Sequence, residues 1–337
     1  MKHKKGLAIL ITLAAIAVIA GVHSLLTTDF GVDFETDFDY DDEAEDTLDR
    51  VISFVNKDKN TAPKSALKKP YVSVIYITGV ISEENKTYNQ KWLLRQIKNA
   101  KSDKNNRAIL LYIDSPGGTV YESDEAYLAL RDYASTRPVF AYFGSLAASG
   151  GYYIGCSADW IFANRNTLTG SIGVIAGQSV DATGLFDKIG VKVTTITAGK
   201  NKNMGNYNAP LTEEQRAIMQ SIADEAYEQF TGIVADARDL PIETVKRLAD
   251  GRIYTAKQAK DNGLIDEVCS LDDAKDTIRD ELAEDTDESV NFVDFKYHYE
   301  ENWMSLLYGA SSFIKNPEAR VYELLGKTAG TCLYLYQ

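Results

Sequence analysis

Ser149 stands in a run of small residues that suits a catalytic nucleophile. The run reads Gly144-Ser-Leu-Ala-Ala-Ser-Gly-Gly-Tyr-Tyr153, and a helical pattern begins within it. A serine that opens a helix gains from the positive end of the helix dipole, and the glycines after it leave room for a substrate carbonyl. The commonest role of serine at such a place is a helix N-cap. Capping alone does not require Ala-Ala-Ser-Gly-Gly, so the run favours a nucleophilic serine.

Two further glycine-bearing junctions follow apolar segments and are candidates for the rest of the site. The first, Asp114-Ser-Pro-Gly-Gly-Thr-Val120, has paired glycines that bring backbone N–H groups close to a ligand. No Walker-type lysine follows, which disfavours a phosphate site. An oxyanion hole formed by the N–H of Gly117 or Gly118 and an ordinary strand-to-helix turn are the interpretations left, and the motif alone favours the turn. The second junction, Thr169-Gly-Ser-Ile-Gly-Val174, offers Ser171, which could orient a base or belong to a turn.

The general base of such a site is predicted to be a lysine. The chain has three histidines, His3, His23 and His298, and none stands beside a nucleophile-like motif. Ser–Lys pairs are a known variant of the catalytic triad, and the lysine acts as a base when burial or neighbouring positive charge leaves its amine partly neutral. Lys200 and Lys202 follow an apolar segment and are both candidates, with an ordinary surface lysine as the alternative for each.

The elements that must hold these residues in place alternate between apolar strands and amphipathic helices. Strands that are apolar on both faces and alternate with helices indicate βαβ units around a covered parallel sheet. The predicted strands are residues 72–78, 108–114, 138–143 and 191–197, and the predicted helices are residues 92–101, 122–133 and a long helix opened by Thr212. The sequence therefore predicts an α/β fold in which the glycine-bearing junctions follow strands.

Composition excludes several kinds of site. The formal net charge is −13, which argues against nucleic-acid binding because phosphate contacts need clustered lysine and arginine. The three cysteines, Cys156, Cys269 and Cys332, are widely spaced and show neither a metal-binding spacing nor an inferable disulfide framework. We expect no metal and no cofactor.

The first 69 residues are predicted to attach the protein to a membrane. Residues 1–5 carry three lysines, and residues 6–28 contain no Asp, Glu, Lys or Arg, which is about the length that a membrane-spanning helix needs. Poor candidate cleavage sites favour an uncleaved anchor over a cleaved signal peptide. The positive-inside rule keeps the basic end cytoplasmic and puts the catalytic domain outside the cell membrane. Residues 29–69 carry a dense acidic run and are predicted to be an extended linker.

Four ordered motifs across residues 70–275 resemble the signal peptide peptidase A family. They are Asp114-Ser-Pro-Gly-Gly, Ala147-Ala-Ser-Gly-Gly-Tyr-Tyr153, Thr169-Gly-Ser-Ile-Gly-Val174, and Asp250-Gly-Arg-Ile-Tyr-Thr-Ala-Lys-Gln-Ala259 with Gly263-Leu-Ile-Asp-Glu267. The resemblance implies a ClpP/crotonase-like fold of repeated ββα units with a parallel sheet, here preceded by one N-terminal transmembrane helix. It also implies a serine endopeptidase with a Ser-Lys dyad and no metal or nucleotide.

The resemblance assigns a role to each residue of the dyad. Ser149 matches the nucleophile, and Ser171 matches a serine that hydrogen-bonds the lysine base. The family's lysine usually stands three residues after a glycine, and Gly199 puts that position at Lys202, which is favoured over Lys200.

Substrate binding and assembly are further implications of the resemblance. The oxyanion is expected on N–H groups of the glycine motifs, at Gly117, Gly118 and Gly150. The implied substrates are remnant signal peptides and other apolar unfolded segments. Family members form homo-oligomeric rings, which would complete apolar substrate pockets between subunits.

Residues 276–337 fall outside the resemblance and are predicted to form a C-terminal extension. Its apolar end, Thr331-Cys-Leu-Tyr-Leu-Tyr-Gln337, is expected to be extended. This tail either lies on a neighbouring subunit or occupies a substrate groove, its own or a neighbour's, by strand addition.

Three other assignments stay open. A membrane serine protease of the stomatin-operon type would be expected to carry further transmembrane helices, and none is predicted after residue 275. A crotonase-like acyl-CoA enzyme is usually cytosolic, so the predicted anchor and the Ser149 motif oppose it. A ring scaffold without catalytic activity would not need Ser149, Ser171 and Lys202 together.

Overall fold

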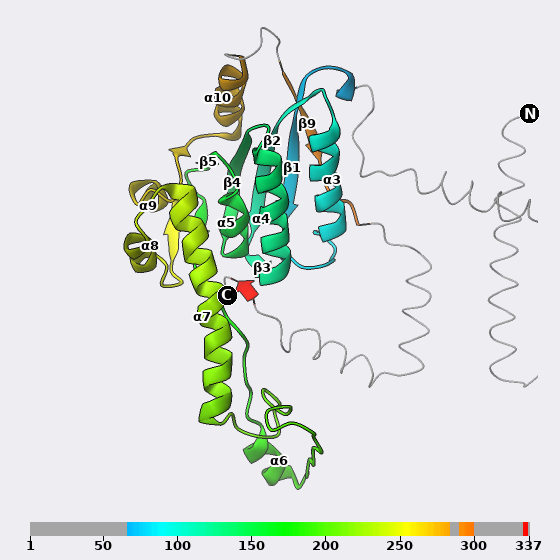
Figure 1. Ribbon diagram of the computed structural model, residues 1–337, viewed down its shortest axis with the longest axis vertical. Helices are drawn as coiled ribbons and strands as arrows, with labels where there is room; N and C mark the ends of the chain where they lie inside the picture. Colours follow the sequence, from blue (N-terminus) through cyan, green and yellow to red (C-terminus); the bar gives the residue numbers. More distant parts are fainter. Residues whose placement is uncertain (1–65, 284–289, 300–332, 336–337) are drawn as a thin grey trace, which may run out of the picture. The chain divides into compact units, whose positions relative to one another are not determined.

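The computed structural model describes residues 66–283, 290–299 and 333–335, which hold a central sheet and the helices that cover it (Figure 1). The predicted membrane anchor, residues 1–28, and the predicted linker up to residue 65 lie outside the described residues. Among the described residues, no helix combines the length and the apolar character needed to cross a membrane.

The central sheet has eight strands in the described part of the chain. They are β1 (Tyr71–Thr78), β2 (Asn106–Ser115), β4 (Val139–Ala148), β5 (Trp160–Ala163), β6 (Leu168–Gly170), β7 (Ile253–Thr255), β8 (Glu267–Val268) and β9 (Asn291–Phe295). The order is β7-β6-β4-β2-β1-β9, with β5 pairing to β4 and β8. All pairs are parallel except β6 with β7. The α/β class and the mostly parallel sheet predicted from the sequence are confirmed.

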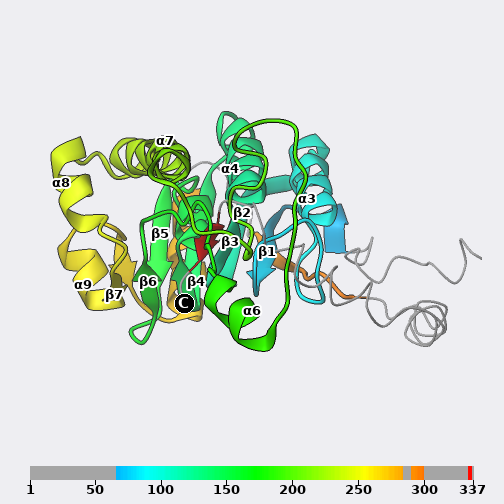
Figure 2. The same cartoon turned by 90° about the horizontal axis from the view of Figure 1, so that it is seen from below.

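Apolar side chains on both faces of β1, β2 and β4 produce two cores. On one face, Ile75, Ile109 and their neighbours contact α3 (Gln90–Ser102), α4 (Val120–Ala134), α5 (Gly150–Gly155) and α7 (Glu213–Arg238). On the other face, Val72, Val74 and Leu110 contact α10 (Leu271–Ala283). Figure 2 shows α3, α4 and α7 side by side along the first face. Burial on both faces explains why these strands read as continuous apolar runs.

Residues 175–212, called the arm below, leave the sheet after β6 and carry the short helix α6 (Thr183–Ile189). The arm ends at Thr212, which caps α7 through a reciprocal capping box with Gln215, as predicted for a helix opened by Thr212. The predicted strand at residues 191–197 is wrong, because this segment forms no strand and its side chains are exposed. Apolar residues alone do not make a strand, and no strand of residues 66–283, 290–299 or 333–335 pairs with this segment.

Two short strands form a separate pair beside the sheet. β3 (Gly117–Thr119) runs antiparallel to β10 (Leu333–Leu335), with Tyr334 opposite Gly118. Residues 333–335, within the C-terminal end that was predicted to be extended, therefore form a strand. The sheet also includes β9, which lies beyond residue 275, the predicted end of the peptidase domain, and pairs with β1.

The remaining elements complete the described fold. They are the short 3-10 helix η1 (Ala66–Lys68) before β1, and the helices α8 (Ile242–Leu248) and α9 (Ala256–Asp261), which flank β7.

Candidate active site

Ser149 occupies a strained turn between β4 and α5. Its backbone has φ 53° and ψ −118°, a conformation that costs a non-glycine residue about 1–3 kcal/mol and that clusters at active sites. The side chain is 1% exposed, and its Oγ has no hydrogen-bond partner among the described residues. A strained strand-to-helix turn with a free hydroxyl is the geometry of a nucleophile elbow. An N-cap role does not explain Ser149, because its side chain makes no capping hydrogen bond to α5.

Close backbone contacts bring the glycine motif of β3 to the start of α5. A methyl group added to Gly150 would lie 3.1 Å from the Gly118 nitrogen and 2.5 Å from Ser123 Oγ. A methyl group added to Gly118 would lie 1.8 Å from the Ile81 carbonyl oxygen, so only glycine fits there. The Gly117 N–H donates to Ser115 Oγ over 3.0 Å. The Gly118 nitrogen therefore lies close to Gly150, the residue that follows Ser149.

Ser171 follows the neighbouring strand and lies beside Ser149. Ala148 pairs with Gly170, so the two serines come directly after paired strand ends. The Ser149 N–H donates to the Gly170 carbonyl over 2.8 Å. Ser171 has φ 50° and is 6% exposed. The structure thus brings together Ser149, Ser171 and the glycine motif of β3.

Arg252 supports Ser171 through its backbone. The Ser171 N–H donates to the Arg252 carbonyl over 2.7 Å, while hydrogen bonds from the Arg252 side chain lower the pKa of Asp250 to about 2. Asp250 and Arg252 belong to the fourth motif of the family resemblance, which assigned them no role. A carbonyl contact leaves no side-chain signal in a sequence, so its identification required the structure.

The two candidate lysines lie in the arm, separated from Ser149 within the chain. Figure 1 shows α6 and the loops around it at the end of α7 that is farther from α5. Lys200 forms an ion pair with Glu214 in the first turn of α7, and this bond lowers the pKa of Glu214. Lys202 is exposed, and its side chain has no partner within residues 66–283. Lys202 is therefore the amine left available for another role.

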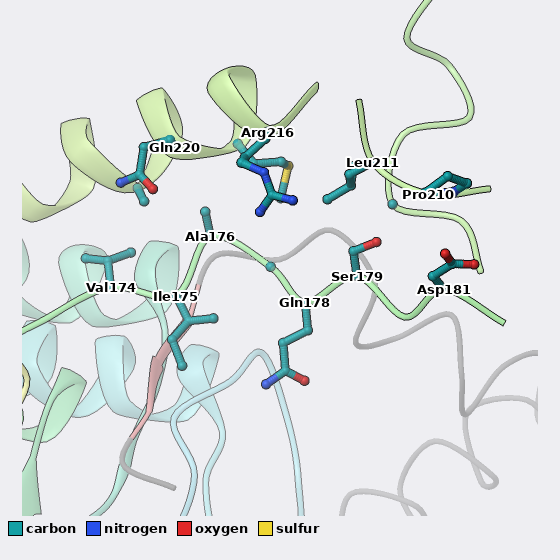
Figure 3. A pocket seen from close by; sticks show the side chains of 14 residues that line it. Val174, Ile175, Ala176, Gln178, Ser179, Asp181, Pro210, Leu211, Arg216 and Gln220 are labelled. Carbon is teal, nitrogen blue, oxygen red and sulfur yellow. The ribbon is translucent and has the colours of Figure 1, made fainter. Parts of the chain in front are cut away.

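The arm and α7 enclose a pocket of about 630 Å³ that Ser149 does not line. Figure 3 shows an extended segment that includes Val174 and Asp181 on one side, with Arg216 and Gln220 of α7 opposite. The extended segment begins three residues after Ser171. The pocket therefore starts close to Ser171 in the sequence, but neither Ser149 nor Ser171 lines it.

Other reactive groups near the site are inactive or scattered. Burial raises the pKa of the Cys156 thiol to about 12, so this thiol is protonated and non-nucleophilic at neutral pH. Among the described residues, no three His, Cys, Asp or Glu side chains come together as metal ligands would.

Comparison with known proteins identifies the family. The model of peptidase family S49 matches residues 131–284, which include Ser149, Ser171 and Lys202. A protein of Synechocystis, provisionally named a protease, is 38% identical over 205 residues, 60% of this chain and 72% of the relative. A protein of Enterococcus faecium, provisionally named signal peptide peptidase SppA, is 36% identical over 231 residues, 66% of this chain and 67% of the relative. The chain belongs to the signal peptide peptidase A family.

Membership of the signal peptide peptidase A family makes the chain a serine peptidase and confirms the resemblance seen in its motifs. Protease 4 of Salmonella typhi, another relative, is 34% identical over 208 residues, 60% of this chain and 33% of that longer protein. The structural match to a mutant ClpP1 from Listeria monocytogenes covers 59% of this chain and 92% of the ClpP1 chain, with TM-score 0.40 and 18% sequence identity. At that score the match assigns no fold, and the α/β class rests on the strand order of this chain.

Proposed function

We propose that this protein is a membrane-attached endopeptidase that degrades remnant signal peptides and other apolar unfolded segments, with Ser149 as nucleophile and Lys202 as general base. The observation that carries the proposal is the buried, strained Ser149, whose Oγ has no partner among the described residues. A buried hydroxyl without a partner destabilises a fold, and such groups persist where function requires them.

The proposed reaction is acyl transfer in two steps. Lys202 takes the Ser149 hydroxyl proton as Oγ attacks the peptide carbonyl, and the N–H groups at Gly118 and Gly150 stabilise the oxyanion. Lys202 then gives the proton to the leaving amine. Water, activated by the same lysine, hydrolyses the acyl-enzyme and releases Ser149. Ser171 orients the lysine amine.

We propose that Lys202 reaches Ser149 from a neighbouring copy in a homo-oligomeric ring. The first buried residue of α7 is Phe230, which contacts the core; it lies 17 residues after Glu213, roughly 25 Å along the helix. The arm before α7 exposes large apolar side chains, among them Val180 at 67%, Leu185 at 58% and Ile196 at 94%. An apolar surface of this kind is typical of a subunit interface, and a head-to-tail contact of identical copies closes into a ring.

A substrate is proposed to bind as an extended strand along β3. The antiparallel pairing of β10 with β3 supports this binding mode, because it places three residues of extended chain opposite the residues that include Gly117 and Gly118. Strand addition of this kind takes its affinity from main-chain hydrogen bonds. By the same pairing, we propose that the C-terminal tail occupies the substrate groove and competes with substrate.

The predicted anchor completes the proposal. Residues 6–28 would hold the protein in the cell membrane, with the catalytic domain on the extracytoplasmic side.

Hydrolysis of an apolar peptide tests the proposed activity. Residues 50–337 are expected to cleave casein and a fluorogenic apolar peptide, and to cleave an acidic peptide of equal length at least about tenfold more slowly, since charged groups resist transfer into an apolar groove. Initial rates are measured on both peptides. Lys200→Ala removes an amine that is already paired with Glu214 and is expected to keep the wild-type rate. If Lys200→Ala is inactive, the general base is Lys200 and not Lys202. Equal rates on the two peptides would contradict the apolar substrate class.

Removal of residues 329–337 tests the tail. The truncated protein is expected to show a KM lower by about fivefold or more, because a tethered competitor acts at high effective concentration. Steady-state kinetics on the apolar peptide measure the change. A synthetic peptide of residues 329–337 should inhibit the truncated protein competitively, whereas a scrambled peptide should not. Unchanged activity together with unchanged protease sensitivity would contradict tail binding.

A further inference from the structure

The helix that begins at Ser149 is too short to hold its own position. α5 has six residues, and an isolated helix needs roughly twelve or more to be stable in water. The strained Ser149 backbone also requires surrounding contacts to maintain it. The position of the nucleophile therefore depends on the side chains that tie α5 to neighbouring elements.

Two adjacent tyrosines tie α5 to different parts of the fold. Tyr152 donates its hydroxyl proton to the Leu264 carbonyl over 2.8 Å, which links α5 to the turn after α9. Tyr153 donates to Asp124 of α4 over 2.6 Å, and its hydroxyl oxygen accepts from Gln229 of α7 over 2.7 Å. The Tyr153 N–H bonds the Ser149 carbonyl over 2.8 Å, one helical turn after the nucleophile.

The Tyr153 ring adds packing contacts to the same two neighbouring helices. Its ring centroid lies 5.5 Å from that of Tyr127 in α4 and 5.0 Å from that of Phe230 in α7. Tyr153 is fully buried. The side chain therefore joins the nucleophile helix to α7 by both a hydrogen bond and an aromatic contact.

α7 is also the element that carries the arm. It is one continuous helix of 26 residues, capped at Thr212 where the arm ends, and its buried residues are Phe230, Thr231 and Val234. The core therefore fixes α7 near Phe230, which contacts Tyr153. The first turns of α7 directly follow the arm. A displacement of the arm would tilt α7 as a whole. The buried end of α7 contacts Tyr153 through Phe230.

We propose that Tyr153 is a positioning residue that transmits the position of the arm helix to Ser149. The inference rests on the proposed roles of Ser149 and the arm. When the arm docks on a neighbouring copy and delivers Lys202, the Gln229–Tyr153 hydrogen bond sets α5 in the orientation that aligns Ser149. Assembly and nucleophile alignment are coupled through Tyr153, whose hydroxyl supplies the hydrogen bond of this contact with α7.

The experiment removes the Gln229–Tyr153 hydrogen bond by substituting each of its two partners in turn. Tyr153→Phe removes the hydroxyl and keeps the ring, and Gln229→Leu removes the donor from an exposed position of α7. Measured quantities are kcat and KM on the apolar peptide, the rate at which a small fluorophosphonate labels Ser149, and the assembly size in solution. Each variant is expected to lower kcat and the labelling rate by about threefold to tenfold, with KM and assembly size unchanged. The double variant should be no slower than Tyr153→Phe alone, because both changes remove the same bond.

Tyr133→Phe is the matched control. Tyr133 is also buried, and its hydroxyl donates to Asn106 of β2 rather than to a residue of α5 or α7. This variant should lose thermal stability and keep the wild-type kcat. Wild-type kcat in Gln229→Leu, or losses that add in the double variant, would overturn the inference. If wild type fails to cleave peptides, the proposed function fails, and the labelling rates still test the coupling: equal or absent labelling in wild type and variants overturns it.

Discussion

Ser149→Ala is expected to lower kcat on the apolar peptide by at least about 10⁴-fold, because loss of the nucleophile removes the covalent pathway altogether. The same change should leave the thermal stability equal or higher. It deletes a buried hydroxyl that has no partner among the described residues, and active sites commonly sacrifice stability for function. Steady-state kinetics and thermal unfolding of the two proteins measure both effects.

Ser157→Ala is the matched control for this prediction. Ser157 is buried just after α5, and its hydroxyl donates to the Ile154 carbonyl over 2.7 Å. The control should lose some stability, since it removes a satisfied hydrogen bond, and should keep the wild-type kcat within a small factor. Full activity in Ser149→Ala would instead favour the scaffold without catalysis.

Two inactive variants are expected to regain activity when they assemble together. Lys202→Ala alone should be as inactive as Ser149→Ala, because the base is lost in every site. In a mixed ring, a site that takes Ser149 from one copy and Lys202 from its neighbour is intact when the two variants meet in the right order. Random one-to-one mixing should restore about a quarter of the wild-type rate, as expected for head-to-tail neighbours around a closed ring. Co-expression of two differently tagged chains, with tandem purification, provides the mixed assemblies for the assay.

The control for this experiment replaces the Lys202→Ala partner with a chain that carries both substitutions. Such a mixture contains no Ser149 and should stay inactive at every ratio. No recovery in the first mixture, with both single variants inactive and fully assembled, would place Ser149 and Lys202 in the same copy. The arm would then have to fold back toward its own α5.

The apolar strands were predictable because their environment is nearly uniform. Residues 72–78 and 108–114 are buried on both faces of a parallel sheet, so a continuous apolar run is enough to identify them. Ser149 was predictable for a related reason. The close contacts of Gly150 leave no room for a side chain, and in the sequence this requirement is visible as a run of small residues around Ser149.

In the arm, the sequence pattern was not enough to predict the secondary structure. Residues 191–197 have the apolar content of a strand, yet they pair with nothing among the described residues and stay exposed. A strand forms only with a partner, and no described strand pairs with this segment. For Lys200 and Lys202, the tertiary structure adds that Glu214 pairs with the first, while the side chain of the second has no partner within residues 66–283.

The sequence by itself determined the α/β class and the family motifs, and it singled out Ser149 and Ser171 as candidates, because each of these depends on residue type at local spacing. Only the tertiary structure decided that Ser149 and Ser171 follow paired strand ends, that the Arg252 carbonyl supports Ser171, and that the candidate base lies away in the arm. These arrangements depend on contacts between residues far apart in the chain. Local pattern does not encode such contacts, since the packing of whole elements decides which strand ends and loops meet.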